Sequence, residues 1–190
     1  AAKVFETDLG CTVEEANPGW EDPYGAFWGL VALESDLAGM RAWLPEHAHH
    51  MSPHLVDFLQ KPFTAEDLTN ANIARKALVT RMAHFMQDYD LLLTPTLAVP
   101  PFPVGMQGPE KTEGRITHPT AWLSFTLPIN MTGQPAATVP AGWTDDGLPV
   151  GLHIVGRHLD DPTVLAASAA YEAARPWKDE WPSLVSEVMG

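Results

Sequence analysis

Two strand-forming runs, joined by a short turn and followed by a helix signal, constrain this chain more than any other feature. Residues 136–141 and 149–155 contain Val, Ile, Thr and Leu, and the turn between them ends at Gly147. Such runs bounded by Asp and Gly predict the two strands of a hairpin. Two aspartates and Pro162 then begin a helix that we expect to continue to Tyr171. The expected unit is a sheet with a helix packed on it.

The N-terminal segment predicts a further helix and strand. Residues 1–9 carry apolar side chains at helical spacing and end at Gly10, whereas residues 11–16 alternate and lead into a turn at residues 17–19. In an α/β layer, a helix normally returns from a preceding parallel strand by a right-handed crossover, and that strand is absent here. The expected fold class is therefore α/β. Residues 1–190 would be a single unit, part of a mixed twisted sheet flanked by helices with its N-terminal half missing.

Three amphipathic helices are expected in the first half of the chain. Residues 24–44 show mostly helical spacing and stop at Pro45. The next helix begins at a capping Ser52 and ends before Pro62. Residues 64–89 carry the clearest pattern, a capping signal followed by an apolar stripe.

A strand and a long loop follow these helices. Residues 91–93 are wholly apolar, which is typical of a buried strand in a parallel sheet. Residues 97–119 are rich in Pro and Gly, and loops of that length in a compact domain are usually functional or disordered. Ligands of open α/β sheets bind beyond the carboxyl ends of the strands, where this loop should lie. We expect it to form a pocket wall or a lid.

Charge and composition exclude several classes of partner. The chain carries 24 acidic and 11 basic residues, a formal net charge of −13, which repels nucleic-acid phosphates and anionic lipid surfaces. Its apolar runs fall short of the roughly 20 residues that a membrane span requires. We expect neither a nucleic acid nor a membrane as partner. The single cysteine, Cys11, precludes an internal disulfide and fits a reducing compartment, so a cytoplasmic protein is expected.

Few side chains form a pattern that supports catalysis or metal binding. Four histidines between residues 47 and 54 could ligate a metal, but no Cys or carboxylate at zinc-like spacing completes the set, and we favour a solvated linker. Cys11 is predicted to be a buried structural thiol, and His153 a core or surface residue of a strand. A Ser-Lys mechanism would need a buried neutral lysine. We expect surface positions for Lys3, Lys61, Lys76, Lys111 and Lys178.

A series of short motifs resembles the C-terminal region of the amidase signature family. These motifs are Asn130-x-x-Gly133-x-Pro135-Ala136, then Pro140-x-Gly142, then Gly147-Leu148-Pro149-x-Gly151, and finally Asp161 ahead of a helix ending at Tyr171-Glu172. Residues 88–96 and the opening helix and strand resemble the same family more loosely. Enzymes of this family hydrolyse amides with a lysine and two serines, one of them in a Gly-Ser-Ser-rich stretch, all in the N-terminal half. This sequence contains no Ser-Ser pair.

The resemblance implies that no catalytic residue lies in this chain, which instead shapes the acyl pocket. In the family one serine attacks the amide carbonyl, a second serine relays the proton, and a neutral lysine is the base. No cofactor and no metal are expected. The implied partners are a small-molecule amide and the missing N-terminal half of the amidase, and the isolated chain could form a homodimer.

Alignment on the Asn130 and Pro135 motif places substrate contacts at Thr120, Leu123 and Leu127, and Trp122 and Phe125 could belong to the same wall. The amidotransferases of the family carry an acidic residue where Leu123 stands, so the resemblance favours an apolar or aryl acyl group over glutamine. Two alternatives stay open: a catalytically inactive binding module derived from an amidase, and a structural or interaction chain.

Overall fold

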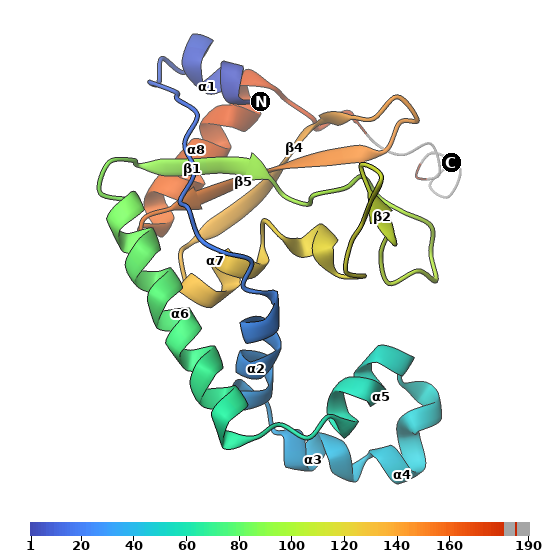
Figure 1. Cartoon of the computed structure of the whole chain (residues 1–190). Coiled ribbons are helices and arrows are strands. Elements are labelled where there is room, and N and C mark those ends of the chain that lie inside the picture. Colours follow the sequence, from blue (N-terminus) through green and yellow to red (C-terminus); the bar gives the residue numbers. More distant parts are fainter. Residues whose placement is uncertain (181–184, 186–190) are drawn as a thin grey trace.

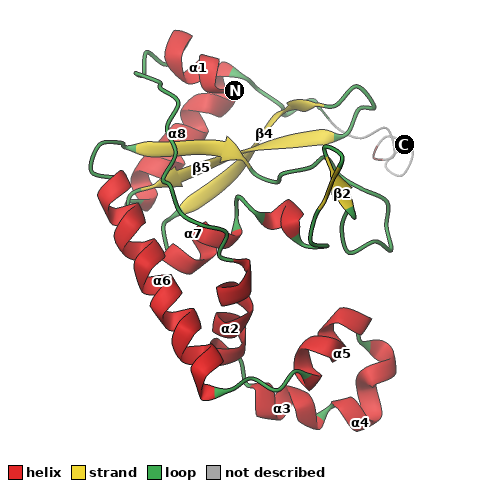
Figure 2. Cartoon of the chain, in the orientation of Figure 1, coloured by secondary structure: helices red, strands yellow, loops and turns green. Residues whose placement is uncertain are grey.

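A three-stranded antiparallel sheet forms the centre of the molecule (Figures 1 and 2). The computed structural model describes residues 1–180 and 185. Its strands lie in the order β1 (Leu91–Pro95), β5 (Pro149–Gly156) and β4 (Ala136–Trp143). β4 and β5 are the predicted hairpin, because they follow each other in sequence and pair along nearly their whole length.

Two helices cover one face of this sheet. α1 (Ala2–Thr7) and α8 (Asp161–Ala174) pack against the face on which Ile154 is completely buried. The rings of Phe5 and Tyr171 stack there with centroids 5.7 Å apart, which joins the two helices. The helix predicted to end at Tyr171 continues to Ala174, after Asp160 caps its start.

Two other helices cover the opposite face. α6 (Ala65–Phe85) and α7 (Leu127–Thr132) pack there, and their Met82 and Ile129 meet Val155 of β5 in one buried cluster. Successive strand residues point to opposite faces, so β5 buries Ile154 on one side and Val155 on the other. The expected α/β class, a sheet flanked by helices, is confirmed.

The long helix α6 begins at the predicted capping signal. The Thr64 hydroxyl accepts a hydrogen bond from the Asp67 amide at 3.1 Å, and the Asp67 carboxylate accepts one from the Thr64 amide at 2.9 Å. This reciprocal arrangement satisfies two of the amide groups that a helix start leaves unpaired. The hydrogen bonds from Thr64 also lower the pKa of the Asp67 carboxyl.

Thr64→Ala is expected to lower the free energy of unfolding by about 1 kcal/mol, because the Asp67 amide loses its acceptor. Urea denaturation of the chain measures this loss. Thr69→Ala is the matched control, since the Thr69 hydroxyl only bonds back to the Ala65 carbonyl on an exposed turn of the same helix. Equal losses in the two variants would contradict the capping role.

The helix predicted for residues 24–44 is interrupted. α2 (Tyr24–Glu34) packs along α6, and α3 (Leu37–Ala42) starts anew after it. The Asp36 carboxylate accepts a hydrogen bond from the Gly39 amide at 2.9 Å, which fixes a new helix start. The hydrophobic spacing continues across this break, so spacing alone did not reveal it.

Pro45 begins a helix rather than ending one. It lies in the first turn of α4 (Leu44–His47), where its missing N–H costs no hydrogen bond. A short 3-10 helix η1 (Ala48–His50) follows, and then α5 (Pro53–Gln60). The predicted cap of α5 is confirmed, because the Ser52 hydroxyl accepts a hydrogen bond from the Leu55 amide at 3.3 Å.

Two predictions about strands were wrong. Residues 11–16 form no strand, since they pair with no strand among the described residues. β1 is present, but it pairs antiparallel with β5. Its continuous apolar run has another cause: Leu91 and Leu93 pack towards α1 and α8, whereas Leu92 packs towards α6 and α7.

The long loop contains a small hairpin that the sequence did not reveal. β2 (Lys111–Thr112) pairs with β3 (Arg115–Ile116) across a two-residue turn in which Glu113 and Gly114 both have positive φ. Positive φ at both positions gives the twist that suits a tight hairpin. A 3-10 helix, η2 (Ala121–Leu123), then leads into α7.

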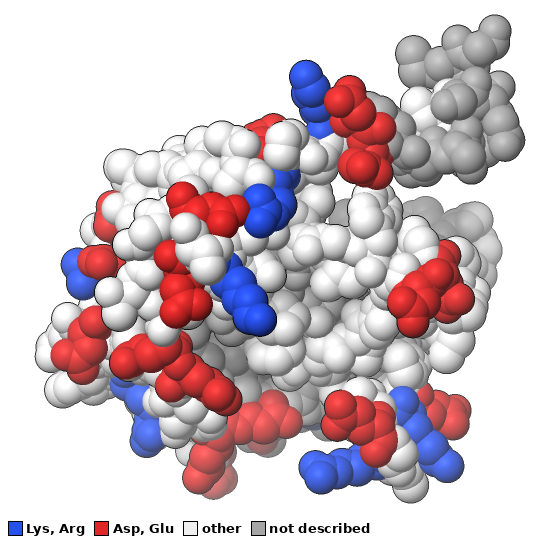
Figure 3. Space-filling view, turned by 90° about the horizontal axis from the view of Figure 1, so that it is seen from above, with Lys and Arg blue, Asp and Glu red and all other residues white. Residues whose placement is uncertain are grey.

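Acidic side chains are spread over the surface. On the face shown in Figure 3, Asp and Glu outnumber Lys and Arg, and the basic side chains form no continuous patch. Among the described residues, no helix combines the length and the apolar character needed to cross a bilayer.

Candidate functional site

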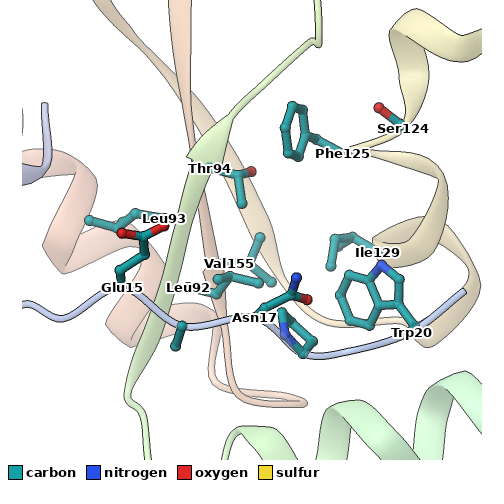
Figure 4. Close-up of a pocket in the computed structure, with 12 residues that line it drawn as sticks. Glu15, Asn17, Trp20, Leu92, Leu93, Thr94, Ser124, Phe125, Ile129 and Val155 are labelled. Carbon is teal, nitrogen blue, oxygen red and sulfur yellow. The ribbon is translucent and has the colours of Figure 1, made fainter.

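A cavity of about 670 Å³ opens between β1, α7 and the irregular segment after α1. Four parts of the chain line it: residues 15–18 with Trp20, residues 92–94, residues 124–125 with Ile129, and Val155 of β5. Figure 4 shows Thr94 and Phe125 facing the same space from β1 and from the turn before α7. Apolar walls with a few polar groups are typical of small-molecule sites.

The irregular wall of the cavity is fixed to α6 and to the loop that follows it. The Tyr89 hydroxyl donates a hydrogen bond to the Glu14 carboxylate, and the Arg81 guanidinium donates to the Gly19 carbonyl. The bond to Glu14 is the main reason why the pKa of Tyr89 is raised. These contacts hold the segment that carries Glu15 and Trp20, two cavity-lining residues, beside β1 and α7.

One buried histidine lies behind the cavity wall. His153, in the middle of β5, is 5% exposed and stands in register between Thr94 of β1 and Thr138 of β4. Its Nδ1 lies 3.4 Å from the Thr94 hydroxyl. Burial lowers the pKa of His153, so its ring is neutral at neutral pH.

Gly151 allows Thr96 and Thr138 to approach each other across β5. A Cβ atom at Gly151 would lie 2.6 Å from the Thr96 hydroxyl oxygen and 2.9 Å from a methyl carbon of Thr138. The hydroxyls of Thr96 and Thr138 are themselves 3.3 Å apart. Any larger residue at this position would separate β1 and β4 beside His153.

Two of the four predicted substrate-binding residues, Leu123 and Leu127, are close in sequence to residues that line the cavity. All four are among the described residues, and none of them lines it, whereas Ser124 and Phe125, which follow Leu123, do. Thr120 and Leu127 are buried, and Leu123 and Trp122 are half-buried. Their role in substrate binding therefore stays a prediction.

Two of these residues fix the long loop. The Trp122 indole N–H donates to the Gln107 carbonyl at 2.9 Å, and its ring packs edge-on against Phe102. The Thr120 amide donates to Nδ1 of His118, whose Nε2 lies 2.8 Å from the Tyr24 hydroxyl. In this structure they tie residues 97–119 to α2 and η2.

The predicted pocket wall borders a second hollow rather than the first cavity. Residues 106–110, Pro119 and His54 of α5 surround a space of about 460 Å³. Residues 97–119 contribute no lining residue to the larger cavity among the described residues. The lid role of this loop stays a prediction.

The other candidate residues lie apart from the cavity. The described residues contain no group of three or more His, Cys, Asp and Glu side chains placed to hold a metal ion. Cys11 is exposed, which corrects the prediction of a buried thiol, because the segment around it runs as irregular chain at the surface. The five lysines are all exposed, as expected.

Sequence reasoning missed several cavity residues. Glu15 and Asn17 belong to the segment expected to form a strand and a turn, Trp20 directly follows that turn, and Ser124 carries no motif. Thr94 offered a usable signal, because it is the first polar residue after the apolar run of β1 and therefore stands towards the carboxyl end of a strand.

Comparisons with known proteins identify the family. The sequence pattern that describes the Amidase family matches residues 41–165. An acylamidase from Rhodococcus erythropolis is 37% identical over 192 residues, which covers 96% of this chain and 39% of the relative. One subunit of the glutamyl-tRNA(Gln) amidotransferase from Lacticaseibacillus casei is 36% identical over 111 residues, 56% of this chain and 21% of its own length.

Solved structures of amidases also superpose on this chain. A bacterial aryl acylamidase of the amidase signature family superposes with a TM-score of 0.83 at 29% identity, over 94% of this chain and 39% of its own. The crystal structure of an amidase superposes with a TM-score of 0.78, also at 29% identity, over 90% of this chain and 39% of its own. This chain thus spans about two fifths of the length of these proteins. A family pattern over residues 41–165, and relatives aligned along nearly the whole sequence, show that the chain belongs to the amidase signature family.

Proposed function

We propose that this chain is the C-terminal, substrate-pocket part of an amidase-type hydrolase that cleaves carboxylic amide C–N bonds. The serine nucleophile, the second serine and the lysine base would come from a part of the polypeptide outside residues 1–190. The substrate would be a small amide with an apolar or aryl acyl group.

The observation that carries this proposal is the composition of the cavity. Its walls are apolar at Leu92, Phe125, Ile129 and Val155, which suits an apolar acyl group. None of the described residues that line it is a lysine, and every lysine of the chain is exposed. A lysine base must be desolvated to be neutral at pH 7, so the chemistry needs a group from elsewhere.

The acyl preference is supported by two relatives. The similar proteins include an acylamidase and an aryl acylamidase, both matched along most of this chain. The half-buried Leu123 could not form an ion pair with a substrate amino group. A binding module that has lost catalysis is the alternative, and the same experiment distinguishes the two.

The test joins this chain to the part of the R. erythropolis acylamidase that it does not match, which makes a protein of full family length. Release of 4-nitroaniline from 4-nitroacetanilide measures amide hydrolysis. The joined protein is expected to hydrolyse the anilide, whereas the 190-residue chain alone is expected to give only the background rate.

Two results would contradict the proposal. Hydrolysis by the chain alone would place the nucleophile within these residues. A joined protein that is folded by circular dichroism and binds the anilide without hydrolysing it would favour the inactive binding module.

A further inference from the structure

We propose that Thr94 determines specificity for amides by accepting a hydrogen bond from the substrate N–H, and that His153 positions its hydroxyl. This inference rests on the proposed function, because it assigns roles at the same cavity. It names a residue pair that lies outside the predicted substrate-binding set.

In this proposal, the Thr94 hydroxyl oxygen has one lone pair that is free to accept a hydrogen bond. Its proton is donated to the Pro95 carbonyl at 3.0 Å. With that assignment, the 3.4 Å contact with Nδ1 of His153 uses a proton on the nitrogen, the tautomer that this proposal adopts, and it occupies one lone pair of the oxygen. A hydroxyl has two lone pairs, so one remains, and Thr94 lines the cavity (Figure 4).

The position of His153 suits it to hold this hydroxyl without adding a charge. The ring is buried between two strands, and its register neighbours on both sides are threonines. Among the described residues that line the cavity, Glu15 carries the only charge, and it lies on the irregular segment that crosses β1. Burial lowers the pKa of His153, which favours the neutral ring, and in this proposal the single N–H of that ring lies on Nδ1, towards Thr94.

An acceptor in this cavity favours amides over esters. A substrate N–H that enters between Phe125, Ile129 and Val155 leaves its water behind, and it needs an acceptor to offset that loss. The Thr94 oxygen provides one. An ester has no N–H, and its oxygen would face the Thr94 lone pair without a hydrogen bond.

The experiment compares matched substrates in the joined protein: 4-nitroacetanilide and 4-nitrophenyl acetate share the acyl and aryl groups. Thr94→Val is expected to lower kcat/KM for the anilide about tenfold, the effect of one lost hydrogen bond, and to leave the ester within about twofold. Thr94→Ser should keep most of the anilide activity. Rates with the chain alone are subtracted as background.

Thr138→Val is the matched control. Thr138 flanks His153 on β4 as Thr94 does on β1, but it is not among the residues that line the cavity. Its removal is expected to leave the ratio of anilide to ester hydrolysis within about twofold of the unmutated protein, since it touches no substrate.

The positioning role of His153 is tested by the ratio of anilide to ester hydrolysis in His153 variants. In His153→Asn the amide nitrogen stands near the place of Nδ1 and can donate to Thr94, whereas His153→Leu cannot donate. We expect His153→Leu to lower the anilide-to-ester ratio about fivefold and His153→Asn to restore most of it. In a Thr94→Val background, His153→Leu should change the ratio no further, because the two residues act through one hydroxyl.

The outcomes separate this inference from the proposed function. If the unmutated joined protein hydrolyses neither substrate, the proposed function fails and this inference fails with it. If it hydrolyses both and Thr94→Val leaves the ratio unchanged, only the inference is overturned. Additive effects of Thr94→Val and His153→Leu would overturn the positioning role of His153. Ester hydrolysis that persists in every variant shows that each protein is folded.

Discussion

Ile154→Ala is expected to lower the free energy of unfolding of this chain by about 3–4 kcal/mol. Ile154 is completely buried in the middle of β5, with Leu93 and Ala137 beside it on the two neighbouring strands. The strands hold these neighbours on both sides, and α1 and α8 cover them, so the space left by the lost methyl and methylene groups cannot close. Urea denaturation followed by circular dichroism measures the loss.

Leu165→Ala provides the control for this prediction. Leu165 lies on α8, which covers the same face, but its side chain is 67% exposed. Its truncation should cost less than about 0.5 kcal/mol. A loss below about 1 kcal/mol for Ile154→Ala would show that the sheet does not form the core described above.

Gly29→Ala is expected to lower the free energy of unfolding by about 2 kcal/mol, because α2 and α6 approach closely at this position. A Cβ atom at Gly29 would lie 2.6 Å from the Cβ atom of Ala71. Ala71 is buried and has no longer side chain that could turn away. The two helices must therefore separate, which loosens the cluster of Leu30, Leu78 and Met131.

Gly25→Ala, in the same helix, should raise the free energy of unfolding instead of lowering it. A Cβ atom at Gly25 would meet nothing within 4 Å, so only the helix propensity changes, and a gain of about 0.5 kcal/mol is expected. Denaturation of both variants under one set of conditions tests the pair. Stabilisation by both substitutions would contradict the close packing of α2 against α6.

The parts of the fold that could be predicted are those whose signals are local. The capping residues Ser52 and Thr64 lie within three residues of the amides they bond. The β4–β5 hairpin has its strands and its turn in one continuous stretch. In each case a few neighbouring residues determine the conformation, so the sequence pattern was sufficient.

The parts that could not be predicted depend on distant partners. Residues 11–16 have the alternation of a strand, yet a strand also needs an edge to pair with, and their own sequence does not supply one. The apolar run of β1 packs against helices on both faces and is half-buried, but the direction of its pairing is set by β5, which comes much later in the chain. The break after α2 depends on a single carboxylate, Asp36.

The candidate site was harder to predict than the fold. Its walls come from four separate segments, and no spacing in the sequence relates Trp20, Thr94 and Phe125. Family alignment pointed to Leu123 and Leu127, which lie on either side of Ser124 and Phe125 in the sequence, and their role in substrate binding stays a prediction. A short 3-10 helix followed by a new helix turns successive side chains in different directions, so an alignment does not say which of them face a cavity.

The strand order β1-β5-β4 has a consequence for how the chain folds. β4 and β5 are neighbours in sequence, so they can pair early through a short turn with little loss of chain entropy. β1 must wait, because its partner β5 is synthesised only after the long loop, η2, α7 and β4. Contacts between such distant residues slow folding. During synthesis β1 therefore stays unpaired until β5 has been made, and the residues of α6 that pack against Val155 lack this partner over the same interval.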